Sequence, residues 1–116
     1  MTYFSNFDSK ESISEAYQGT SAQDLLGATV HIAWYGYGSY CGSSIVIYEK
    51  NGKLYEVNGS HCSCNGLEEQ WSPEETSWKA IGMRPFDFGG GEYDGWEKAK
   101  AKLLRLLKDK NVEVKE

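Results

Sequence analysis

The chain is poor in the residues that cross-link or rigidify a small domain. Its 116 residues include three cysteines and two prolines. No apolar run is long enough to cross a membrane, and the segment after Met1 lacks a basic stretch followed by an apolar one. We therefore expect no secretory signal, and thiols that stay reduced. A chain of this length is expected to form a single domain, residues 1–116, with one core.

Positive charge is also scarce, since the formal net charge is −5. Phosphate binding requires a basic surface, so the net charge predicts no direct binding of nucleic acid. The basic residues that do occur are concentrated near the C-terminus, where Trp96, Ala99, Leu103, Leu106 and Leu107 recur at helical spacing. That helix, predicted over 95–109 with Asp94 as its cap, would carry a positive stripe on its other side: Lys98, Lys100, Lys102, Arg105 and Lys108.

What the sequence does contain is a strong hairpin signal. Two runs rich in β-branched and aromatic residues, 44–49 and 53–58, flank Asn51–Gly52. Asn-Gly favours a two-residue type I′ turn, because that turn needs positive φ at both positions. With this loop, paired residues sum to 103, and the register places Cys41 opposite Cys62 at the open end of the hairpin.

All three cysteines gather at that open end. Cys64 lies two residues beyond Cys62, so strand alternation would keep it on the same face. Three thiolates with a fourth ligand, either His61 or a carboxylate, would form a closed structural Zn²⁺ site. His61 points to the opposite face if the strand stays extended, so its participation requires a turn after Ser60, which Asn58–Ser60 could supply.

Other interpretations of the same residues remain open. Cys41 and Cys62 could form a disulfide, because directly opposed strand positions approach the required separation. The cysteines could also be small buried residues without chemistry. A cysteine hydrolase with Cys41 as nucleophile and His61 as base is a further alternative, although Cys41 leads into a strand rather than a helix. A zinc deaminase is disfavoured because its paired motifs are missing.

The remaining segments predict an α+β fold. Residues 8–17 are predicted to form a helix capped by Asp8, and 28–35 a strand in which His31 is more simply a half-buried strand residue than a ligand. Ser72–Pro73 followed by Glu75 predicts a helix from Pro73 to Ile81. The expected architecture is a small antiparallel sheet of three or more strands in meander order, including the Asn-Gly hairpin, with helices packed on one face.

Acidic side chains are dense after the hairpin: Glu68, Glu69, Glu74 and Glu75. By default such a run is a solvated face. It could instead present carboxylates to a basic surface of a protein partner, or lend one oxygen to the metal.

The run Leu54–Cys64, L-Y-E-V-N-G-S-H-C-S-C, resembles a family of small bacteriophage and prophage proteins. The likeness extends over roughly 34–81 and includes Gln70–Trp71 and Pro73–Thr76. The chain also resembles phage-encoded anti-CRISPR proteins that act on type II effector nucleases.

The resemblance implies a protein without enzymatic activity that acts in the cytoplasm of an infected bacterium. It would bind the host CRISPR effector nuclease and block binding or cleavage of target DNA, with the zinc as a structural staple. Since such nucleases have basic nucleic-acid channels, an acidic surface could compete for them. The alternatives are the cysteine hydrolase and a phage adaptor for another host protein.

Overall fold

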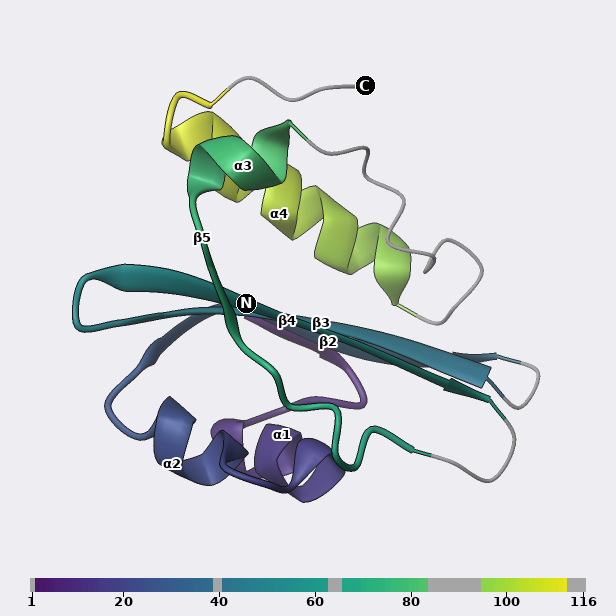
Figure 1. The fold of residues 1–116 in the computed structure, drawn as a ribbon. Helices are drawn as coiled ribbons and strands as arrows, with labels where there is room; N and C mark the ends of the chain where they lie inside the picture. The colour runs from purple at the N-terminus through teal and green to yellow at the C-terminus, as the bar shows by residue number, and fades with distance from the viewer. Residues whose placement is uncertain (1, 39–40, 63–65, 84–94, 113–116) are drawn as a thin grey trace.

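A computed structural model of the chain describes residues 2–38, 41–62, 66–83 and 95–112. Its centre is a five-stranded sheet in the order β1-β2-β3-β4-β5, with helices on both faces (Figure 1). The elements in chain order are β1 (Tyr3–Ser5), α1 (Lys10–Tyr17), α2 (Ser21–Leu25), β2 (Thr29–Gly38), β3 (Cys41–Lys50), β4 (Lys53–Cys62), β5 (Glu74–Thr76), α3 (Trp78–Gly82) and α4 (Trp96–Asp109).

The strands confirm the predicted fold class and extend it. β2, β3 and β4 form the expected antiparallel meander, while β1 adds a parallel strand beside β2 and β5 an antiparallel one beside β4. The predicted hairpin register is confirmed, since Lys50 faces Lys53 and Cys41 faces Cys62. Asn51 and Gly52 both have positive φ, at 54° and 78°, as a type I′ turn requires.

The expectation that helices cover one face of the sheet is wrong. α1 and α2 lie against one face and α3 and α4 against the other (Figure 1). The reason lies in the central strands, which are apolar on both sides. Val46 and Tyr48 belong to the core beneath α1, whereas Ile45 and Ile47 belong to the core beneath α4. A strand with two apolar faces needs cover on both of them.

Local capping signals were assigned to the wrong residues in two places. α1 is capped by Ser9, whose side chain accepts a hydrogen bond from the Ser12 backbone amide, and not by Asp8. Gly95 occupies the N-cap of α4, and the predicted cap Asp94 lies outside the described residues. The amphipathic pattern of α4 itself is confirmed, with Trp96, Ala99, Leu103 and Leu107 buried. No helix in the described ranges is long and apolar enough to span a membrane.

The helix predicted from Pro73 is also wrong. Glu74–Thr76 forms strand β5, which pairs with Leu54–Glu56, and the helix begins only at Trp78 with Ser77 as its cap. Pairing with the open edge of β4 satisfies backbone groups that a helix at this point would leave exposed on both elements. Tertiary pairing thus outweighs the local Ser-Pro signal.

Candidate functional site

The open end of the β3–β4 hairpin brings two of the predicted metal ligands together. Cys41 and Cys62 are directly opposed, with their Cα atoms 3.9 Å apart, and the structure joins them as a disulfide. Both side chains lie on the face of the sheet that carries α4, because Ile45 and Ile47 at alternate positions of β3 belong to that core. The pairing expected from the hairpin register is therefore present.

His61 does not join the two sulfur atoms. β4 stays extended through Cys62, so the predicted turn after Ser60 is absent and His61 points to the opposite face, beneath α1. There its Nε2 lies 2.7 Å from the Tyr35 hydroxyl oxygen. Its Nδ1 is buried and has no hydrogen-bond partner among the described residues. The sheet thus separates His61 from Cys41, and the nucleophile–base pair of the hydrolase alternative is not assembled in this arrangement.

The ring of His61 fits against the strand opposite because residue 42 is a glycine. A Cβ atom on Gly42 would lie 2.6 Å from His61 Nε2 and 3.0 Å from the Gly36 carbonyl oxygen. Tyr35 and Tyr37 complete the surroundings, with ring centroids 5.7 and 5.6 Å from that of His61. Burial raises the pKa of the Tyr35 hydroxyl, which contacts His61, above its ordinary value.

Tyr17, the last residue of α1, packs on the same face of the sheet as Tyr35. The buried Tyr17 hydroxyl donates a hydrogen bond to Ser44 Oγ at 2.9 Å, and burial raises its pKa. Gly59 allows this approach, since a Cβ there would lie 2.8 Å from both Tyr17 Oη and Leu67 Cδ2. Tyr17 and Leu67 therefore fill the space over Gly59 on this face of the sheet.

A zinc ion would need more donors than these strands supply. The described residues contain no group of three or more His, Cys, Asp or Glu side chains that could hold a metal. Cys64, the third predicted thiol, lies outside the described residues. Cys41 and Cys62 could each donate a thiolate if reduced, but a disulfide provides no thiolate ligand. His61 on the far face does not fit the same ion as these two sulfur atoms.

The four predicted contact residues Glu68, Glu69, Glu74 and Glu75 are all exposed, and we call them the acidic edge. The segment that carries them runs beside β4 from the side of α1 to α3 (Figure 1). Glu74 and Glu75 are fixed by β5 at the sheet edge. Glu75 makes an exposed ion pair with Lys53 at 3.6 Å. A single exposed lysine beside four carboxylates leaves the acidic edge with a net negative charge, and salt weakens the exposed ion pair.

Gln70 anchors the acidic edge, and the sequence analysis missed it. Its side-chain amide accepts a hydrogen bond from Ser60 N at 2.9 Å and donates one to Ser60 O at 2.7 Å. It also donates to Gly66 O at 2.9 Å. The amide thus pairs with β4 as a neighbouring strand would. The available signal was the hairpin register, which points the backbone groups of Ser60 away from β3 and leaves them in need of a partner.

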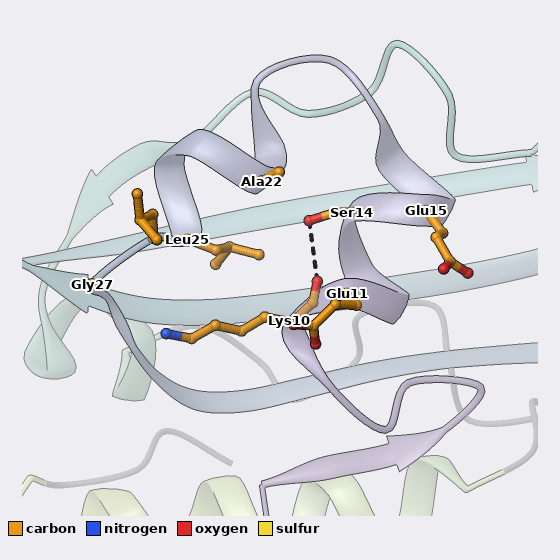
Figure 2. Close-up of a pocket in the computed structure, with 8 residues that line it drawn as sticks. Lys10, Glu11, Ser14, Glu15, Ala22, Leu25 and Gly27 are labelled. Atoms are coloured by element: carbon orange, nitrogen blue, oxygen red, sulfur yellow. Dashed lines mark hydrogen bonds between the residues drawn. The ribbon is translucent and has the colours of Figure 1, made fainter.

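A pocket of about 370 Å³ lies between α1 and α2 (Figure 2). Its wall combines the apolar Ala22, Leu25 and Leu26 with Glu11 and Glu15. Its polar groups are partly engaged internally, because Lys10 Nζ donates to the Ala28 carbonyl and Ser14 Oγ to the Lys10 carbonyl. Leu26 is 76% exposed, so this side of the molecule presents an apolar residue near acidic ones.

Comparison with known proteins identified no relative of the chain. No family model matches the chain, and neither a curated protein nor a solved structure matches it.

Proposed function

We propose that this protein is a phage-encoded inhibitor that binds a type II RNA-guided effector nuclease of the bacterial host and blocks its binding or cleavage of target DNA. The proposal rests on the sequence resemblance and on one structural observation that supports it. The acidic edge is exposed and its second half is fixed on a strand. Carboxylates on a backbone held in this way can compete with nucleic acid for a basic channel without the cost of ordering a loop.

Both charged and apolar residues would contribute to the contact with the nuclease. Complementary charges chiefly raise the association rate and select the partner, whereas buried apolar residues supply much of the affinity. Leu26, beside the pocket between α1 and α2, is an exposed apolar residue available for that second role. The protein would act stoichiometrically, as a ligand of the nuclease.

The test is cleavage of target DNA by the purified nuclease–guide complex with increasing amounts of the protein. We expect inhibition that saturates near one protein per nuclease. The variant E74Q/E75Q should bind the nuclease about 30-fold more weakly, from about 1 kcal/mol per lost carboxylate.

The matched control is E97Q/D109N, which removes two exposed acidic side chains from α4, outside the proposed contact, and should inhibit like the natural chain. Undiminished cleavage at large excess of the folded protein contradicts the proposal. Equal weakening by the two variants contradicts the assignment of the contact to the acidic edge.

The structural zinc is a separate part of the proposal and concerns the reduced chain. Cys41 and Cys62, opposed on one face, support it by offering two thiolates, and Cys64 would supply a third. A carboxylate is then the fourth ligand consistent with the position of His61. Elemental analysis of protein purified under reducing conditions should give one zinc per chain, and loss of zinc should lower stability. A metal-free reduced chain of unchanged stability contradicts it.

A further inference from the structure

The basic face of α4 has no role in the proposed contact. Lys98, Lys102 and Arg105 follow one another at spacings of four and three residues, so they form one row along the helix, the basic row. At 1.5 Å per residue, the row spans about 10 Å along the helix axis. It lies opposite Trp96, Ala99, Leu103 and Leu107, which are buried in the core.

The three basic side chains form no ion pair with a carboxylate in the described part of the chain, where the ion pairs are His31–Glu49 and Lys53–Glu75. One acidic residue, Asp109, follows Arg105 by one turn on the same side of α4. Like charges four residues apart on a helix repel, so Lys98 and Lys102 weaken the helix slightly.

The helices on the two sides of the sheet differ in charge. α1 and α2 together carry one basic side chain, Lys10, and three acidic ones, Glu11, Glu15 and Asp24, whereas α4 carries five basic and two acidic side chains. The helix α4 itself has a net charge of +3, from five basic and two acidic side chains, so the net charge of −5 for the whole chain does not describe it.

We propose that the basic row binds the sugar–phosphate backbone of a nucleic-acid duplex. A duplex carries one negative charge per 1.7 Å of axis, so three cations within about 10 Å can each meet a phosphate. The proposal reverses the expectation drawn from the net charge, and it does not depend on the inhibitor function.

The side chains of α4 also exclude other polyanionic partners. Its apolar residues are committed to the core, so the helix cannot insert them into a membrane surface as an amphipathic anchor does. Its one aromatic residue, Trp96, is buried, so α4 offers no platform on which single-stranded bases could stack. The proposed contacts are made to phosphates, which carry no sequence information, so we expect binding that is independent of sequence.

The experiment measures binding of a short, fluorescently labelled DNA duplex to the full chain by fluorescence anisotropy. We expect a Kd on the order of 10⁻⁴ to 10⁻⁵ M, as for other non-specific contacts. Three phosphate contacts give a slope of log K against log salt of about −2.7. Affinity should then fall about 40-fold between about 50 and 200 mM salt.

Two variants with the same charge change separate the basic row from net charge. K98Q/K102Q should weaken duplex binding and make the salt slope shallower by about 1.8, because two phosphate contacts are lost. K50Q/K53Q removes two lysines at the β3–β4 turn and should keep the natural slope. Glutamine has nearly the helix propensity of lysine, and thermal melting confirms that both variants fold.

Four results would overturn the proposal. The first is no duplex binding at about 50 mM salt, and the second is equal loss of affinity in the two variants. The third is tighter binding of the corresponding single strand, or of vesicles containing anionic lipid, than of the duplex. The fourth is salt-sensitive self-association of the chain without DNA that K98Q/K102Q abolishes, which would assign the row to the acidic side of a second copy.

Discussion

Substitution of Gly42 by alanine tests the placement of His61 on the α1 side of the sheet. The new methyl group would lie 2.6 Å from His61 Nε2 and 3.0 Å from the Gly36 carbonyl oxygen. Overpacking of this kind costs about 1–3 kcal/mol. Replacing glycine where φ is ordinary returns about 0.4–1 kcal/mol through the unfolded chain. We therefore expect G42A to lower the free energy of unfolding by about 1–2 kcal/mol.

The assay is a double-mutant cycle measured by urea unfolding of the natural chain, G42A, H61A and the double variant. H61A alone should be destabilising because it removes the contact with the Tyr35 hydroxyl. In the H61A background the alanine at position 42 no longer meets the imidazole and keeps only its contact with the Gly36 carbonyl oxygen, so its cost should fall by more than half. The expected coupling is about 1 kcal/mol in favour of the double variant.

Additive effects in this cycle would refute the reasoning. Additivity would mean that the ring of His61 does not lie over Gly42, as would be the case if a turn after Ser60 carried the ring to the side of the thiols. The cycle thus also decides between the observed strand and the geometry that the His61 metal-ligand hypothesis requires.

Three further predictions concern the same side of the sheet. The free energy of unfolding should fall as pH rises above 10, because burial raises the pKa of Tyr48 to about 12 and raises that of Tyr17. In that range the unfolded chain loses protons that the folded chain keeps. Urea titrations at pH 9 to 12 measure this, and a free energy of unfolding that does not change with pH would mean that these tyrosines are exposed. G59A should cost about 1–3 kcal/mol through contact with Tyr17 and Leu67, and a neutral effect in thermal melting would contradict the packing. Q70A should cost about 1–3 kcal/mol and increase hydrogen exchange at the β4 edge, whereas unchanged exchange there would contradict its role as a strand substitute.

The hairpin and the amphipathic helix α4 could be predicted because their signals are local. Asn51–Gly52 dictates the turn, and the turn dictates every pair along β3 and β4, including Cys41 with Cys62. The spacing of Trp96, Ala99 and Leu103 likewise dictates which side of α4 is buried.

The elements that were missed or misassigned depend on distant partners. Glu74–Thr76 is a strand because β4 has an open edge, and nothing within its own residues favours that over a helix. Tyr3–Ser5 becomes a parallel strand through pairing with Ala33–Tyr35, which is separated from it by two helices. Tertiary context of this kind overrides local propensity.

The candidate site could be predicted where it depends on the alternation of side chains between the two faces of one strand. The position of Cys62 opposite Cys41 follows from the register, and so does the opposite orientation of His61 once β4 remains extended. The role of Tyr35 beside His61 also requires the β2–β3 register, in which Tyr37 faces Gly42. That register, in which Gly38 pairs with Cys41, was not predicted from the sequence.

The candidate site depends on the hairpin register that places Cys41 opposite Cys62, and cysteine mapping tests this register directly. The purified chain, mildly oxidised and then digested without reduction, should give one cross-linked peptide pair containing Cys41 and Cys62, with Cys64 recovered as a free, alkylated thiol. A Cys41–Cys64 or Cys62–Cys64 cross-link as the main product would contradict the register and the site built on it.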